Sequence, residues 1–184
     1  AFSKCGKYVI DRSEGWFYRS DNILTETDPA KIEWQLLPDG DVGLKNPDFG
    51  EIQAEQNLVA MNDGSLYCMY RTAGDHPCHA YSRDGAHTWT MPEYATYTPG
   101  GLKFKNSRAC PRVWKTAAGK YLFWFHHHGA HKVAYRGRNP DWLSGGIEKD
   151  GHIYWSQPEI VLYDSAPENC LFDAQTGLPG PGGG

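Results

Sequence analysis

The chain has 184 residues and a formal net charge of −4 at neutral pH, and aromatic residues make up 14% of it. Its 21 glycines, 12 prolines and 7 tryptophans are typical of a protein built from many short strands separated by turns. No apolar run approaches the roughly 18 residues that cross a bilayer, and the N-terminus lacks a signal-peptide apolar segment. A sequence isoelectric point near 6.0 argues against general nucleic-acid binding. We therefore expect a soluble, all-β protein with neither membrane nor nucleic-acid partners.

The first predicted strands cover residues 8–10 and 16–18, and a polar connection follows from residue 20. A hairpin is predicted from strands 57–61 and 65–71, which Asn62-Asp63-Gly64 joins. Another strand covers residues 78–81, and Trp89 begins an outer strand. Further strands are predicted at 111–115, 121–127 and 132–135, then a loop at 145–151, and then strands at 153–155 and 159–163.

Two stretches of the chain have the same form, a glycine turn followed by an aromatic-rich strand. They are residues 62–70 and 117–125, separated by about 55 positions. A Trp-x-x-Pro-Glu pattern also recurs at residues 89–93 and 155–159. Repeats of this kind predict β-propeller blades of four antiparallel strands, with Trp89 and Trp155 at equivalent buried positions.

The length allows about three such blades, which is a partial propeller. Residues 1–50 are predicted to hold N-terminal strands and a connection, with part of a first blade as the alternative. Residues 51–165 form the blades, and residues 166–184 are a Gly/Pro-rich tail. The remaining blades would come from a missing part of the chain or from another chain.

Ser82 to Trp89 reads Ser-x-Asp-x-x-x-Thr-Trp and resembles the Asp-box turn of the sialidase and BNR-repeat superfamily. The usual box has glycine at the position of Ala86. Arg108, just before a strand that starts near Pro111, is similar to the arginine that opens a sialidase inner strand. The resemblance covers about residues 50–165 and implies a propeller that acts on carbohydrate. Gln53-Ala54-Glu55 stands where a sialidase has its first Arg-Ile-Pro element, so the catalytic set differs.

When the two repeats are superposed, Arg71 falls on His126, and Thr72 falls on His127. Different polar groups at matched strand ends predict that neighbouring blades build one site at the mouth of the propeller. The predicted catalytic residues are Glu55, Asp75, His126 and His127. The predicted substrate-binding residues are Arg71, Arg108 and His128. Paired arginines suit an acidic sugar because a guanidinium can bind a carboxylate through two parallel hydrogen bonds.

Seven of the eight histidines lie between residues 76 and 131. His126 and His128 would face the same side of a strand and offer two metal ligands, with His131 as a third. The alternatives are hydrogen bonding or proton transfer to a sugar, and a polar turn without a shared task. Because no carboxylate or cysteine stands at clear ligand spacing, we predict neither a metal nor a cofactor.

Five cysteines are too few for a disulfide scaffold in a chain of this length. Cys68 and Cys78 would face each other across the hairpin, as a disulfide or as two buried thiols. A disulfide would indicate export, and we expect a secreted or periplasmic protein.

The function predicted from these residues is a carbohydrate-active enzyme of sialidase-like type, a glycoside hydrolase acting on an acidic glycan. One alternative is a polysaccharide lyase, in which a histidine removes the proton next to a uronate carboxylate. Another is a propeller that binds an oligosaccharide or polysaccharide without catalysis, since one fold serves many functions.

Overall fold

The computed structural model describes residues 2–4, 13–50, 52–106, 109–126 and 138–163. This part of the chain is all β, in antiparallel sheets, and its only helical turns are short 3₁₀ turns at Pro29–Lys31 and Pro47–Phe49. The predicted all-β fold class is therefore confirmed. Within the described ranges, no helix is long and apolar enough to cross a membrane.

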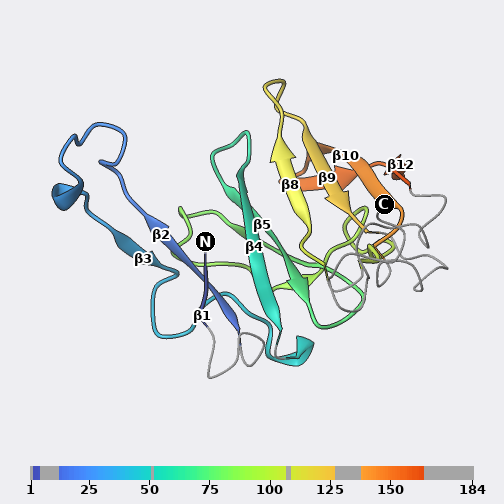
Figure 1. Cartoon of the computed structure of the whole chain (residues 1–184), viewed down its shortest axis with the longest axis horizontal. Helices are drawn as coiled ribbons and strands as arrows, with labels where there is room; N and C mark the ends of the chain where they lie inside the picture. Colours follow the sequence, from blue (N-terminus) through green and yellow to red (C-terminus); the bar gives the residue numbers. More distant parts are fainter. Residues whose placement is uncertain (1, 5–12, 51, 107–108, 127–137, 164–184) are drawn as a thin grey trace, which may run out of the picture.

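Three sheets follow one another along the chain (Figure 1). The first sheet contains β1 (Phe2–Lys4), β2 (Glu14–Arg19) and β3 (Gln35–Leu37). The second sheet contains β4 (Gln53–Ala60), β5 (Leu66–Thr72), β6 (Cys78–Ser82) and β7 (Glu93–Tyr94). Its spatial order β4-β5-β6-β7 is the up-and-down order of a propeller blade.

The third sheet has the spatial order β11-β10-β9-β8. These strands are β8 (Arg112–Lys115), β9 (Tyr121–Phe125), β10 (Asp141–Lys149) and β11 (His152–Trp155). A short strand, β12 (Glu159–Leu162), also pairs with β10. The first strands of the second and third sheets meet where the side-chain oxygen of Asn57 accepts a 2.5 Å hydrogen bond from the amide of Val113. The chain thus forms a partial, propeller-like β fold.

Strand β5 is buried on both faces because it lies in the middle sheet. Tyr67 and Met69 point to the core between the second and third sheets. Cys68 and Tyr70 point to the core shared with the first sheet. Successive side chains of a strand point to opposite faces. Because both faces of β5 meet a core, the sequence here is a continuous apolar run rather than an alternation of apolar and polar residues.

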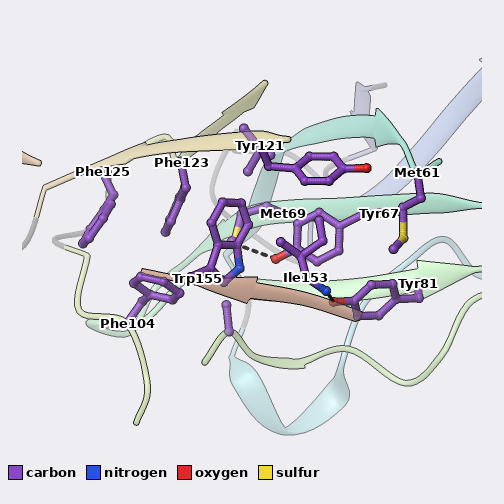
Figure 2. Packing of buried hydrophobic residues seen from close by; sticks show 12 residues of the cluster. Met61, Tyr67, Met69, Tyr81, Phe104, Tyr121, Phe123, Phe125, Ile153 and Trp155 are labelled. Atoms are coloured by element: carbon purple, nitrogen blue, oxygen red, sulfur yellow. Dashed lines mark hydrogen bonds between the residues drawn. The ribbon is translucent and has the colours of Figure 1, made fainter. Parts of the chain in front are cut away.

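The core between the second and third sheets is largely aromatic (Figure 2). Phe104 comes from the connection before β8 and is completely buried at its centre. Its ring packs edge-on against Phe123, Phe125 and Trp155, with ring centroids 4.9, 5.2 and 6.3 Å away. Such edge-to-face pairs are a preferred aromatic geometry and stabilise the contact beyond the burial of area.

Two predicted elements are wrong. Trp89 does not begin the outer strand, which is β7. The loop predicted at 145–151 lies mostly within β10. A glycine is required within this strand because a Cβ at Gly146 would come within 2.7 Å of the Trp155 ring and 2.8 Å of Ile153. Gly146 therefore serves close packing in a strand, not a turn. The strands predicted at 8–10 and 132–135 lie outside the described residues.

The two tryptophans of the Trp-x-x-Pro-Glu pattern do not occupy equivalent positions. Trp89 is only partly buried, in the loop before β7, with its ring centroid 5.2 Å from that of Phe17. Trp155 lies in β11 and is 5% exposed. Of the two options for the hairpin cysteines, the structure has free, buried thiols at Cys68 and Cys78.

Candidate functional site

The turn after β6 is held by one carboxylate. Asp84 accepts hydrogen bonds from the Thr88 amide at 2.9 and 3.1 Å, from the Thr88 hydroxyl at 2.5 Å and from the Ser82 hydroxyl at 2.8 Å. These hydrogen bonds, those from Thr88 first, lower the pKa of Asp84 to about 2. Ala86, at the place of the usual glycine, has a φ of 79° and is buried. The turn therefore serves the fold.

The start of β4 and the end of β5 bring two predicted site residues together. The Nη1 atom of Arg71 lies 3.3 Å from the Oε1 atom of Glu55. Both side chains reach solvent, with 24% of Arg71 and 40% of Glu55 exposed. The pairing of β4 with β5 shifts register between Ala54 and Asn57, and Glu55 has a φ of 61°. Bulges and left-handed non-glycine residues are enriched at functional sites, where they re-aim side chains.

Glu55 also lies near the segment that leads into the third sheet. The thiol of Cys110 donates to the backbone oxygen of Pro111 at 3.6 Å, and the side chains of Glu55, Arg112 and Arg71 lie close enough to act on this thiol electrostatically. Burial raises the pKa of Cys110, and Glu55 raises it further. The Nε atom of Arg71 is buried and has no hydrogen-bond partner within the described part of the chain. We refer to Glu55, Arg71, Cys110 and Arg112 as the mouth cluster.

Asn106 ties the turn after β5 to the end of β9. Its amide N–H donates to the backbone oxygen of Asp75 at 2.8 Å, and its side-chain oxygen accepts from the amide of His126 at 3.1 Å. The side-chain nitrogen donates to the oxygen of Ala109 at 2.7 Å. The residue is 2% exposed. The backbones of two predicted catalytic residues, Asp75 and His126, are thus both hydrogen-bonded to one buried residue, Asn106.

His126 faces a carboxylate that the sequence did not identify. Its Nδ1 atom lies 2.5 Å from the Oδ1 atom of Asp141 and 3.1 Å from the backbone oxygen of Arg138. Burial lowers the pKa of His126, and the opposing effect of Asp141 offsets this only in part. Because Nδ1 forms its hydrogen bond with the backbone oxygen of Arg138, the neutral imidazole carries its proton there and presents Nε2 as a base.

The structure describes four of the seven predicted site residues. Glu55 and Arg71 form an ion pair, Arg71 and His126 stand at the matching ends of β5 and β9, and Asp75 is joined to His126 through Asn106. Arg108, His127 and His128 lie outside the described residues, and so does His131. Among the described ranges, no group of three or more His, Cys, Asp or Glu side chains is placed to hold a metal ion.

No protein-family model and no curated protein matches the chain. Solved sialidase structures do match it. A mutant of NanB sialidase from Streptococcus pneumoniae is 18% identical, with a TM-score of 0.51, over 70% of this chain and 20% of that chain. NanB in complex with a chlorobenzylammonio ethanesulfonate is 15% identical, with a TM-score of 0.50, over 83% and 23% of the two chains. The intramolecular trans-sialidase from Ruminococcus gnavus is 15% identical, with a TM-score of 0.47, over 70% and 26%.

The two NanB matches establish the class of fold, which is that of the sialidases. The present chain spans about a fifth of the length of these NanB chains. At such identities the likeness defines the fold alone, since one fold hosts many activities. The BNR-type repeat stays a prediction.

Proposed function

We propose that this chain supplies part of the active site of a carbohydrate-active enzyme, a glycoside hydrolase that acts on an acidic glycan. The observation that carries the proposal is the mouth cluster, in which Glu55 forms an ion pair with Arg71 of the same sheet and acts electrostatically on Cys110, just before the third sheet begins. Charged groups from adjacent sheets gather at one end of the fold, where each is partly open to solvent. The sialidase-like fold supports the same reading. Further blades, from this chain or another, complete the site.

Arg71 is proposed to bind the acidic group of the sugar. Its guanidinium is oriented by Glu55 through one Nη1 contact, and about a quarter of the side chain faces solvent. A planar, permanently charged group held in this way can bind a carboxylate through two hydrogen bonds, which a lysine cannot do. Replacement by lysine therefore tests geometry separately from charge.

Glu55 and Asp75 are proposed as the two carboxyl groups that hydrolysis of a glycosidic bond requires, one as acid and one as base or nucleophile. The left-handed backbone at Glu55 costs on the order of 1 to 3 kcal/mol, so the fold must hold it there against strain. Asp75 is anchored through its backbone to Asn106, which leaves its position fixed relative to His126.

The His126–Asp141 pair favours a second candidate, a polysaccharide lyase. A neutral imidazole whose Nδ1 proton is held by the Arg138 backbone oxygen, with the Asp141 carboxylate beside it, can accept a proton at Nε2 from the carbon next to a uronate carboxylate. The electron pair of that C–H bond then forms a carbon–carbon double bond, and the glycosidic oxygen leaves with its bonding electrons and takes up a proton. An arginine such as Arg71 would neutralise the carboxylate.

The test measures binding and turnover on the same preparation. Calorimetry compares an acidic oligosaccharide with its neutral, reduced counterpart. A fluorogenic glycoside reports hydrolysis, and the ultraviolet absorbance of an unsaturated uronate reports elimination. Arg71→Lys should weaken binding of the acidic ligand by about 1 to 3 kcal/mol. Arg19→Lys is the matched control, because Arg19 forms an exposed ion pair with Asp21 on the first sheet.

Each outcome selects one function. Release of the fluorophore that Glu55→Gln abolishes supports the hydrolase. Elimination that His126→Gln abolishes, while Glu55→Gln leaves it intact, supports the lyase. Arg71-dependent binding without either product identifies a carbohydrate-binding propeller. Equal affinity for acidic and neutral ligands in wild type and Arg71→Lys refutes the acidic-glycan proposal.

A further inference from the structure

The row of three sheets ends in two apolar faces that are open to solvent. The first sheet lies at one end of the molecule and the third at the other, with the second between them (Figure 1). Each outer sheet uses one of its faces for a core shared with the second sheet. Side chains alternate between the two faces of a strand, so the neighbours of these core residues point outward.

The outward face of the first sheet is largely aromatic. Phe17 and Leu37 point to the core, so Tyr18 and Leu36, which pair across β2 and β3, point the other way. Tyr18 is 58% exposed, Leu36 44% and Trp34 54%. The rings of Tyr18 and Trp34 pack edge-on, with their centroids 6.0 Å apart. We refer to Tyr18, Trp34 and Leu36 as the first-sheet face.

The outward face of the third sheet is apolar as well. Trp114 of β8 pairs with Leu122 of β9, which in turn pairs with Gly145 of β10. Ile147 lies on the same face, two residues beyond Gly145. Trp114, Leu122 and Ile147 are 49%, 36% and 54% exposed. We refer to these three residues as the third-sheet face, and contiguous exposed apolar side chains of this kind mark an interaction surface.

Strand β9 indicates what the third-sheet face contacts. Its run Tyr121–Phe125 is continuous and apolar, like that of β5. Strand β5 is apolar on both sides because a sheet packs against each of them. Alternate residues of β9 lie in the aromatic core with the second sheet, and Leu122 and Trp124 give the other side the same character. The composition of β9 therefore fits a strand with a sheet on both faces.

We propose that the third-sheet face binds the first-sheet face of a second copy of this chain, and that two copies close one propeller ring. The contact repeats the packing of sheet on sheet that already joins the three sheets. Because the two faces are different surfaces, the interface is head-to-tail, and such interfaces form rings where the rotation closes. Two copies of three sheets give six, within the roughly four to eight blades of closed propellers.

Charges beside the two faces are of opposite sign. The connection next to the first-sheet face, residues 20–34, contains four acidic residues and one basic residue. On the third sheet, Arg112 lies two residues before Trp114 and Lys149 two residues after Ile147, so both are in register with the face. Complementary charges fix which surfaces pair, and like charges opposite each other are costly. This pattern favours head-to-tail contact over the pairing of two identical faces.

Sedimentation velocity measures the mass of the full 184-residue chain over a range of concentrations. A species of twice the chain mass of 20.6 kDa is expected. Tyr18→Asp and Trp114→Asp each place a charge in both interfaces of the ring and should raise the dissociation constant about tenfold or more. Leu102→Asp makes a comparable change at an 81% exposed site outside the two faces and should leave the constant unchanged.

An equimolar mixture of Tyr18→Asp and Trp114→Asp distinguishes a head-to-tail contact from other dimers. Each variant alone has a new charge in every interface, whereas a mixed pair retains one interface with both faces intact. The mixture should therefore associate more tightly than either variant. Leu36→Asp mixed with Ile147→Asp repeats the test at independent positions, and urea unfolding shows that each variant is folded.

Four results would overturn the proposal: a single-chain mass up to the solubility limit, a dimer that neither variant weakens, a mixture that associates no better than its components, or a series of ever larger assemblies. The last result would mean that the ring does not close. The proposal does not rest on catalysis or on glycan binding. Arg71→Lys should leave the mass unchanged, so failure of the acidic-glycan proposal and failure of this one are distinguishable.

Discussion

Removal of the Phe104 ring tests whether the connection before β8 holds the second and third sheets together. The side chain is completely buried and packs against Phe123, Phe125 and Trp155. Buried aromatic side chains remove about 150 to 250 Å² from water. At about 25 cal/mol per Å², this corresponds to about 4 to 6 kcal/mol, of which alanine retains a part. We expect Phe104→Ala to destabilise the chain by about 3 to 5 kcal/mol.

The assay is urea unfolding followed by tryptophan fluorescence, because Trp155 lies in the same core. The midpoint should fall while the slope of unfolding free energy against urea stays unchanged. Leu102→Ala is the control: Leu102 lies in the same connection and is 81% exposed, so we expect a change within about 0.5 kcal/mol. A loss below about 1 kcal/mol for Phe104→Ala would show that the sheets do not depend on this ring.

Three further predictions concern contacts between and within the sheets. Glu148→Gln should cost about 1 to 2 kcal/mol in urea unfolding, because the Glu148 carboxylate accepts a 2.7 Å bond from the Asn62 amide and another from the Tyr121 hydroxyl; an unchanged midpoint would contradict it. Asp84 has a folded pKa of about 2, below the 3.8 of an ordinary aspartate, so its contribution to stability is present above about pH 4 and is lost as the pH falls towards 2. Asp84→Asn should reduce the dependence of stability on pH in this range. A variant with the wild-type dependence would contradict the assigned hydrogen bonds of Asp84. The imidazole of His126 should titrate below 6.5 in NMR spectra, so acid disfavours the folded state, and Asp141→Asn should lower the pKa further because Asp141 favours the charged form. A rise in the pKa of His126 in Asp141→Asn would contradict the assigned pair of His126 and Asp141.

The hairpin of β4 and β5 was predictable because its signals are local. Asn62-Asp63-Gly64 provides the turn, with Gly64 at a φ of 85°, and the short, aromatic-rich apolar run after it favours a buried strand. Strand β10 was missed for the opposite reason. Gly145 and Gly146 look like a turn in the sequence, and the ring of Trp155 that requires a glycine there comes from another strand.

The candidate site likewise contains residues that the sequence could predict and residues that it could not. Comparison of the two repeats placed Arg71 and His126 at matching strand ends, and Glu55 beside Arg71 was within reach of sequence reasoning. Asn106 and Asp141 were not, because neither belongs to a repeat or a motif. Each acts through partners that are distant in the chain: Asn106 bonds Asp75 and His126, which lie 31 positions before and 20 positions after it. Such contacts depend on how the sheets pack.

Strand β5 connects the two hydrophobic cores with the candidate site. This strand contributes Tyr67 and Met69 to one core and Cys68 and Tyr70 to the other, and all four are completely buried. Because both faces are packed, neither rotation nor a slip in register is possible without exposing one of the two cores. Arg71 is the next residue along this strand, so its backbone is held by the best-packed element of the described fold. Rigid elements position functional side chains more precisely than loops do, and this placement lets Arg71 recognise a ligand by geometry as well as by charge.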